Sequence, residues 1–215
     1  MRLGDLSLSE NLFFLGHDPF TGKPRIRQDI LDIGLAGAVL ADLVFDERVA
    51  LDNSVVILRN RYATGDPVTD RVLALIAREV GRHGVRDWVE HLRYKVFHVV
   101  SASLVDRGLV VPKESRGILR KSVTYPPADL RTASGPRARI RSAMLGRTRC
   151  DLPTGALALL AWALGLDDIA EPDLTRRQMA DWVAQLKSTT IDPIAGLVTG
   201  TEAAIAANVY GGNRG

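Results

Sequence analysis

Apolar residues recur at the three- and four-residue spacing of an α-helix along most of the chain, which predicts a mainly α-helical protein. The clearest example is residues 28–45, with apolar side chains at Ile30, Leu31, Ile33, Leu35, Val39, Leu40, Leu43 and Val44. Interleaved glycines and alanines leave one side of this segment smooth, so we expect a central core helix that a second helix approaches closely. Residues 155–166 are apolar nearly all round, which predicts another buried helix.

A capping motif and a turn precede this core helix. Ser7 stands three residues before Glu10, the spacing of a capping box, so a short helix is expected to begin after Ser7 and to continue through Phe14. Gly16 can end that helix. Residues 19–24 contain two prolines and Gly22, and they predict a turn in which Gly22 tolerates a positive φ.

The remaining segments predict shorter helices and two β-hairpins. Helical patterns cover residues 68–80, 85–91, 95–107, 131–146, 175–186 and 194–209. One hairpin is expected to join residues 49–51 to 55–58, and a basic hairpin is expected to pair residues 109–111 with 117–125. The side chains predicted to be buried include Leu35, Val39, Trp88, Leu159 and Trp162. The expected fold is mainly α, a single helical domain over residues 1–210 with a buried helical core and short β-hairpins, followed by a flexible tail at 211–215.

Composition and charge narrow the class of protein. The chain has 215 residues, enough for one domain, and its lone Cys150 excludes an internal disulfide and fits a reducing compartment. The N-terminus does not have the pattern of a signal peptide, and the apolar runs are shorter than the ~20 residues that span a bilayer. The net charge is only +3, yet residues 113–149 hold ten cations against Glu114 and Asp129. This basic segment predicts an acidic partner surface, unless it is a solvated loop of no functional role.

The sequence contains no motif typical of catalysis or of metal binding. The four histidines show no zinc-ligand spacing, and the chain contains no nucleophile elbow, phosphate-binding loop or Ser-x-x-Lys motif. Asp29 and Asp32 lie near the start of the core helix, where the helix dipole favours negative charge. The sequence therefore predicts a protein that is not an enzyme and that needs no metal or cofactor.

Several segments together resemble the Golgi phosphoprotein 3 family, peripheral membrane proteins that recognise phosphatidylinositol 4-phosphate. The opening LSLSENLFFL, the turn DPFTGKPR and the helix GLAGAVL match family patterns in order and spacing. The later segments VSASLVDRGLV, SVTYP and GALALLAWALGLDDIAE resemble further family segments. The resemblance implies a mostly helical domain whose hairpin mediates contacts between copies. Sparse lysine and short termini suggest a bacterial member.

The resemblance also implies a lipid-headgroup pocket, but with different residues. The family's tryptophan corresponds to Arg27 here, and its three arginines fall at Ala36 and near Tyr94 and Phe97. Cations nearby are Arg25, Arg27, Arg93 and Lys95. The expected lipid-binding residues are therefore Arg25, Arg27, Arg93, Tyr94 and Phe97.

Three functions remain open. The first is a cytoplasmic peripheral membrane protein on the inner face of the membrane, which binds anionic phospholipid, such as phosphatidylinositol 4-phosphate. Each surface cation would contribute about 1 kcal/mol to this binding. Its membrane-facing cations would be Arg116, Arg120, Lys121, Arg137, Arg139 and Arg141. The second is a winged-helix-like regulator that binds nucleic acid, an unlikely partner because no helix shows a reading face. The third is an adaptor that uses the basic hairpin at residues 109–125, which can also self-associate.

Overall fold

The computed structural model describes residues 6–116, 121–169 and 174–211, and the side chains of residues 115, 116, 121 and 122 lie outside that description. The described elements are α1 (Leu8–Gly16), α2 (Gln28–Phe45), β1 (Val49–Asp52), β2 (Val55–Leu58), α3 (Pro67–Ile76), α4 (Val85–Asp106), β3 (Lys113–Arg116), β4 (Lys121–Thr124), α5 (Leu130–Met144), α6 (Leu152–Ala163), α7 (Arg176–Thr189) and α8 (Asp192–Gly211). In these residues the strands form two separate antiparallel hairpins, β1–β2 and β3–β4. The fold class is mainly α with short hairpins, as predicted.

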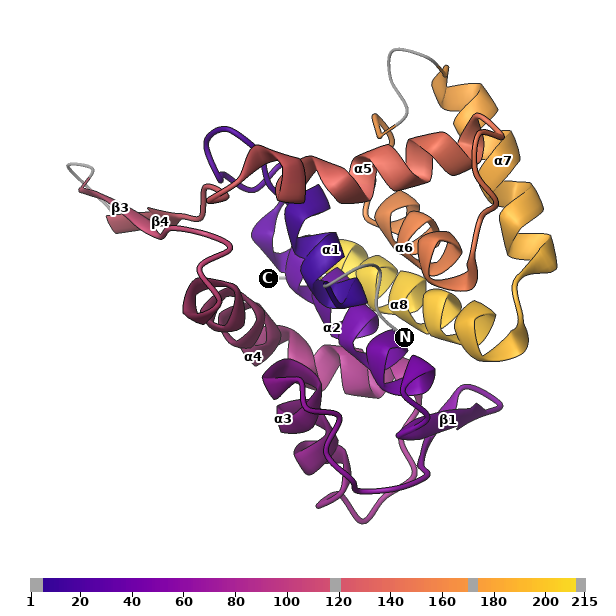
Figure 1. Ribbon diagram of the computed structural model, residues 1–215. Coiled ribbons are helices and arrows are strands. Elements are labelled where there is room, and N and C mark those ends of the chain that lie inside the picture. The colour runs from indigo at the N-terminus through magenta and orange to yellow at the C-terminus, as the bar shows by residue number, and fades with distance from the viewer. Residues whose placement is uncertain (1–5, 117–120, 170–173, 212–215) are drawn as a thin grey trace.

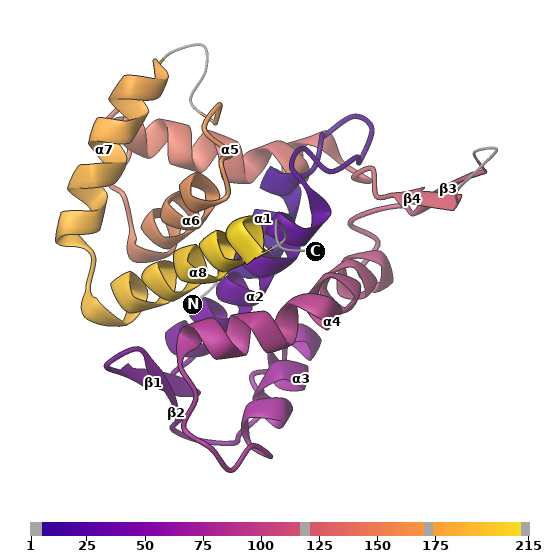
Figure 2. The ribbon, with the colours of Figure 1, turned by 180° about the vertical axis from the view of Figure 1, so that it is seen from behind.

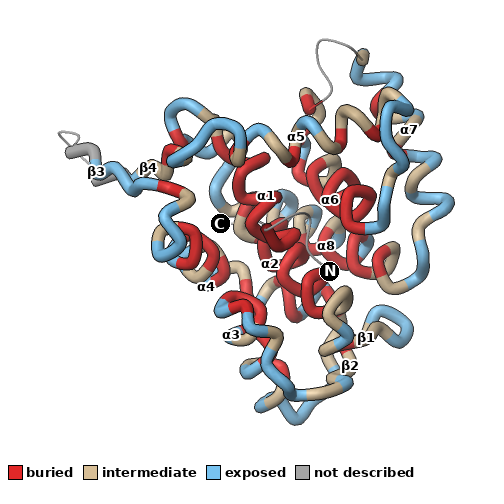
Figure 3. The backbone as a smooth tube through the Cα atoms, viewed as in Figure 1, coloured by how far each residue is buried: buried red, intermediate tan, exposed pale blue. Residues whose placement is uncertain are grey.

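Helix α2 is the centre of the molecule and packs against α1, α4 and α8 (Figures 1 and 2). Nearly all of its length from Ile30 to Leu43 is buried, and Figure 3 shows α1 and α2 as the most continuously buried part of the chain. Helices α3 and α4 cover one side of this core, whereas α5, α6 and α7 lie beyond α1 and α8 on the other (Figure 1). Burial of Leu35, Val39, Trp88 and Leu159 is confirmed.

The start of α1 is held by buried polar groups. Ser7 forms the expected capping box with Glu10, and the carboxylate of Asp42 in α2 accepts the N–H groups of Leu8 at 2.7 Å and Ser9 at 3.0 Å. Asp42 thus satisfies two backbone donors that a helix N-terminus leaves without partners. Burial raises the pKa of the Asp42 carboxyl to about 7. The short helix is therefore fixed to α2 by hydrogen bonds as well as by its leucines and phenylalanines.

Two predicted helix boundaries were wrong. Helix α3 ends at Ile76 rather than at Val80, which is almost wholly exposed and has no apolar surface to pack on. Residues 85–106 form one helix, α4, instead of two. Between the two predicted helices, Tyr94 is exposed and Arg93 bonds to Asn208 of α8, while Leu92 and Val96 continue the buried stripe.

Two further expectations need correction. Strand β3 is Lys113–Arg116, which pairs with β4, whereas Leu109 and Val110 turn inward and Val110 is part of the core. The predicted strand at residues 109–111 was therefore wrong, because Val110 is buried in the core and makes only an isolated bridge, to Pro127. Trp162 is only partly buried and packs at the edge of the core, beside the C-terminal turns of α8.

Candidate functional site

The β3–β4 hairpin projects from the body of the molecule, and the turn at residues 18–24 lies against its base (Figures 1 and 2). The backbone N–H of Tyr125 donates to the carbonyl of Gly22 at 3.0 Å. Gly22 has a φ of 65°, and a Cβ atom there would collide with the backbone of Tyr125 and Pro126, so this contact requires glycine. The turn and the hairpin are thus one joined surface.

The turn is shaped by Asp18. Its Oδ1 accepts the N–H groups of Thr21 at 2.7 Å and Phe20 at 3.1 Å, and also the Thr21 hydroxyl. These hydrogen bonds, led by the one from the Thr21 backbone, hold the pKa of Asp18 below its usual value. The result is a well-defined loop that presents Phe20, 75% exposed, together with exposed Lys23.

Exposed apolar side chains gather around this joined surface, which we call the hairpin end. Of the eleven large apolar residues exposed in the part of the chain that the structure describes, five belong to it: Phe20, Tyr94, Val111, Val123 and Leu130. Exposed cations stand among them at Lys23, Lys113 and Arg131. Apolar groups mixed with cations are the composition of surfaces that bind at a membrane interface.

A cavity of about 300 Å³ opens beside the hairpin end, between the end of α1, the start of α2, the middle of α4 and strand β4. Its walls include the rings of Tyr94, Phe97 and Tyr125, and Phe97 meets Tyr125 edge-to-face with 5.6 Å between ring centroids. Its polar groups include His17 and Asp32. We call it the aromatic cavity.

His17 lines this cavity and carries a buried acceptor without a partner. Its Nδ1 lies 2.7 Å from the carbonyl of Phe13, and a carbonyl can only accept, so Nδ1 carries the proton. Burial lowers the pKa of His17 to about 4, although the bond to Phe13 opposes this, so the ring is neutral near pH 7. Nε2 is then a lone-pair acceptor, and it is buried without a hydrogen-bond partner.

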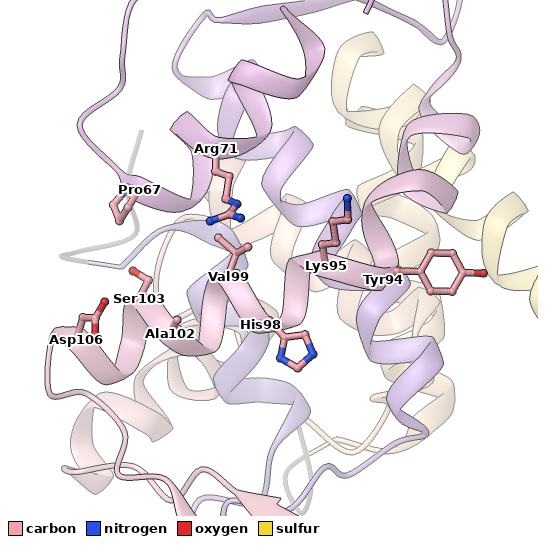
Figure 4. Close-up of a pocket in the computed structure, with 9 residues that line it drawn as sticks. All are labelled: Pro67, Arg71, Tyr94, Lys95, His98, Val99, Ala102, Ser103 and Asp106. Carbon is pink, nitrogen blue, oxygen red and sulfur yellow. The ribbon is translucent and has the colours of Figure 1, made fainter. Parts of the chain in front are cut away.

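A second, larger concavity of about 400 Å³ runs between α3 and α4 (Figure 4). Arg71 reaches into it from α3, and Lys95, Val99 and Ser103 line it from α4, with Asp106 near the Pro67 end. Tyr94 and His98 border both this groove and the aromatic cavity. The two hollows therefore lie on either side of α4, one with cations on its walls and one with aromatic rings.

Comparison with models of known protein families shows to which family the chain belongs. The family model described as Golgi phosphoprotein 3 (GPP34) matches residues 8–205, which include every helix from α1 to α7 and most of α8. The chain belongs to the GPP34 family. Membership is consistent with lipid binding in general and with a role other than catalysis. No helix among the described residues is long and apolar enough to cross a bilayer, and these residues contain no cluster of ligands suited to a metal ion.

The five residues predicted to bind lipid fall into two groups in this GPP34 chain. Tyr94 and Phe97 line the aromatic cavity, whereas Arg25, Arg27 and Arg93 do not. Arg25 pairs with Asp168 of the segment after α6, and it also donates to the carbonyl of Leu15.

The other two arginines belong to a polar chain that joins three helices. Arg27 binds both carboxylate oxygens of Asp29, at 3.0 Å and 2.6 Å, and Asn208 of α8 donates to the same carboxylate at 2.7 Å. Although burial opposes it, these bonds hold the pKa of Asp29 below its usual value. Arg93 donates to Asn208 at 2.6 Å and to the hydroxyl of Tyr94 at 2.7 Å. These arginines therefore connect α2, α4 and α8 and are not directed into the aromatic cavity.

The cations predicted to face a membrane also fall into two groups: three arginines of α5 that have partners within the protein, and three residues of the hairpin whose side chains are not described. Arg137 donates to the backbone carbonyls of Asp168 and Ile169, and Arg139 bonds to the side chain of Asn11 in α1, with burial lowering its pKa. Arg141 is half-buried and also has a partner. Arg120 and the side chains of Arg116 and Lys121 lie outside the described residues.

Sequence reasoning missed two residues of the aromatic cavity. In the sequence, His17 belongs to no metal-ligand pattern, and Asp32 has only the position near a helix start that the helix dipole favours. No local pattern marks either residue, because the cavity forms only where α1, α2, α4 and the hairpin meet. The hairpin end did have one signal in the sequence, because Phe20 is an aromatic residue placed inside a predicted turn.

Proposed function

We propose that this GPP34 protein is a peripheral membrane protein that docks on anionic phospholipid through the hairpin end. The observation that carries the proposal is the grouping of exposed apolar residues with exposed cations around one turn and one projecting hairpin. Membership of the family supports it. The protein would then act in the cytoplasm, on the inner face of the membrane, without catalysis.

The charges at this surface are sufficient for reversible binding. A Lys or Arg near an anionic leaflet contributes about 1 kcal/mol, so Lys23, Lys113 and Arg131 together supply roughly 3 kcal/mol. Phe20 and Leu130 add apolar contact with the headgroup boundary. Any contribution of Arg116, Arg120 and Lys121 at the hairpin adds to this charge. Arg137, Arg139 and Arg141 contribute their long-range field, while their side chains also hold the fold together.

Selection among anionic headgroups, including phosphatidylinositol 4-phosphate, is proposed to involve Arg25, Arg27 and Arg93 beside Tyr94 and Phe97. Arg27 is exposed and lies at the start of α2, so a phosphate would compete with Asp29 for its guanidinium. The Arg27→Ala variant is therefore expected to change the order of preference among anionic lipids. Co-sedimentation with vesicles that differ only in one anionic lipid measures this, and an unchanged order would remove Arg27 from the site.

Vesicle co-sedimentation with matched variants tests the docking surface. Phe20→Ser is expected to weaken binding to anionic vesicles, whereas Tyr62→Ser, which changes an equally exposed aromatic residue in a loop remote from the hairpin, should not. The triple change K23Q/K113Q/R131Q should weaken binding and its salt dependence, because exposed charges are screened over about 8–10 Å at physiological ionic strength. The control R59Q/R61Q/R78Q alters the net charge equally at exposed positions away from the hairpin end.

The experiment also separates lipid docking from the adaptor function. If Phe20→Ser and K23Q/K113Q/R131Q both bind anionic and neutral vesicles as the wild type does, the hairpin end is not a membrane surface. The exposed hairpin would then serve a protein partner. In the described residues β3 and β4 pair only with one another, and an unpaired strand edge can pair with another chain. Self-association through this edge predicts a concentration-dependent mass that is lost when a glycine-serine turn replaces residues 113–124.

The structure disfavours the nucleic-acid function as a winged helix at the first hairpin. The helix before β1–β2 is α2, and all its residues from Ile30 to Leu43 except Asp32 are buried, so it has no face for a DNA groove. A DNA shift assay at the salt concentration used for vesicles is the matching control, and we expect no sequence-specific complex.

A further inference from the structure

We infer that the aromatic cavity binds a primary ammonium group, so that this protein recognises an amine in addition to the anionic surface of the membrane. The polar groups of the cavity point to this ligand. The neutral His17 ring lines the cavity, and its Nε2 is a buried acceptor without a donor. An unpaired buried acceptor is unfavourable, so a ligand N–H is favoured at this position.

Asp32 supplies the charge that an ammonium group needs. Its side chain lines the same cavity, and its Oδ1 accepts the Gln28 amide at 2.7 Å. An ionised carboxylate accepts several hydrogen bonds and donates none, so the remaining acceptor positions of Asp32 also suit a donor ligand. Burial raises the pKa of Asp32 above its usual value, and a cation beside the carboxylate would favour its ionised form.

The aromatic rings favour a cation independently of these acceptors. Phe97 stands 5.6 Å from Tyr125 and 6.0 Å from His17 between ring centroids, and Tyr94, 71% exposed, borders the mouth. Aromatic faces carry negative potential and attract ammonium groups within about 6 Å. None of the described residues that line the cavity is Lys or Arg. A phosphate placed here would meet the carboxylate of Asp32 and the lone pair of His17, with only the imidazole of His98 among the described lining residues to offer a positive charge.

A primary ammonium fits better than a quaternary one. A quaternary ammonium has no N–H to donate, so it would leave Nε2 of His17 without a partner, whereas a primary ammonium has three donors for His17 and Asp32. The ligand can be the headgroup of an ethanolamine phospholipid or a free amine. The lipid source rests on the proposed docking at the hairpin end, because Val123 of β4 lines the cavity and belongs to that surface. Binding of a free amine does not depend on docking.

Titration of the ¹⁵N-labelled full chain with ethanolamine, followed by NMR, tests the site. We expect shifts of the backbone signals around His17, Asp32 and Phe97, weaker shifts with tetramethylammonium, and none there with inorganic phosphate. Asp32→Asn should weaken ethanolamine binding about tenfold, as expected for the loss of one charge-assisted contact of about 1.4 kcal/mol. Asp29→Asn is the matched control, because Asp29 lies one turn earlier in α2 and bonds to Arg27 and Asn208 outside the cavity. His17→Phe keeps a ring against Phe13 but removes the acceptor, so it should also weaken binding.

Vesicles distinguish the two sources of the amine. At a constant fraction of anionic lipid, ethanolamine lipid should increase binding of the wild type relative to choline lipid, and Asp32→Asn should abolish that increase while its binding to anionic vesicles persists. Ethanolamine binding in solution without any effect of ethanolamine lipid supports the site with a free amine as its ligand. The inference is overturned if neither form of ethanolamine binds the wild type, if Asp29→Asn weakens binding as much as Asp32→Asn, or if phosphate shifts the cavity signals. The Phe20 and lysine variants report on membrane docking separately.

Discussion

Glu10 and Arg107 form an ion pair of 2.6 Å between residues that are 97 positions apart in the sequence. The Glu10 side chain is fully buried, while Arg107 is about one-third exposed and caps the C-terminus of α4. Glu10 also accepts the backbone N–H of Ser7 through its second carboxylate oxygen. One carboxylate thus completes the capping box of α1 and anchors the end of α4, from which the chain continues to the hairpin end.

Removal of one partner of this pair should destabilise the fold strongly. Arg107→Ala leaves the Glu10 carboxylate buried without its cation, a change that typically lowers the free energy of unfolding by about 3–5 kcal/mol. The double variant E10Q/R107A should lose less than the sum of the single changes, because the glutamine amide carries no charge. Urea denaturation of the four proteins of this cycle measures the coupling. If the losses of unfolding free energy in the single variants simply add up in the double variant, solvent screens the ion pair of Glu10 and Arg107.

Asp42 should make stability depend on pH in the opposite sense to an ordinary ion-paired carboxylate. Its folded pKa is about 7, above the unfolded value of 3.8, so the folded state binds the proton more tightly. The contribution is present below pH 4 and is lost as the pH rises towards 7. Relative to Asp42→Asn, the wild type should lose up to about 1.4 kcal/mol of unfolding free energy per pH unit in that window.

The unfolding free energy of the wild type is compared with that of Asp42→Asn at each pH, because His17 affects stability in an overlapping pH range. The folded pKa of His17 is lowered to about 4, so the stability that neutral His17 contributes to the fold is lost as the pH falls from about 6.5. Both proteins keep His17, and the difference between their unfolding free energies isolates Asp42. Parallel curves between pH 4 and 7 would contradict a raised pKa for Asp42.

Two glycines on α8 should respond oppositely to alanine. A Cβ atom on Gly200 would lie 2.6 Å from Cβ of Val85 in α4, and a β-branched side chain on a helix has little freedom to move away. Gly200→Ala is expected to lower the free energy of unfolding by about 1–3 kcal/mol. At Gly196 the nearest atom would be 3.5 Å away, so Gly196→Ala should stabilise the helix by about 0.5–1 kcal/mol. Equal effects in thermal unfolding would mean that α8 and α4 separate easily.

Leu159 tests whether α6 is a core helix or a binding surface. Its side chain is 1% exposed, and Leu159→Ala should lower the free energy of unfolding by roughly 2–5 kcal/mol through lost burial and a residual cavity. The neighbouring partly buried Trp162 provides a comparison, since it lies at the edge of the core. A loss below about 1 kcal/mol for Leu159→Ala in denaturant unfolding would indicate that α6 repacks or is exposed.

The sequence alone determined the parts of this protein that depend on short-range pattern. The apolar spacing of residues 28–45 predicted α2 to the residue, and Ser7 with Glu10 predicted the capping box, because helix periodicity and capping involve groups within one or two turns. The same reasoning was wrong between residues 91 and 95, where two helices were predicted instead of one. Packing on α2 and α8 decides the continuity of α4, with Leu92 in the core and Arg93 bonded to Asn208 of α8.

Tertiary structure alone decided which charged groups are available to a ligand. The sequence predicts that three arginines meet anionic lipid: Arg25, Arg93 and Arg139. In the structure they bond instead to Asp168, Asn208 and Asn11, each more than a hundred residues away in the chain. The aromatic cavity likewise brings together His17, Asp32, Phe97 and Tyr125 from four separate segments. Electrostatic and hydrogen-bond partners are set by distance in space, and a linear pattern contains no information about which distant segments meet.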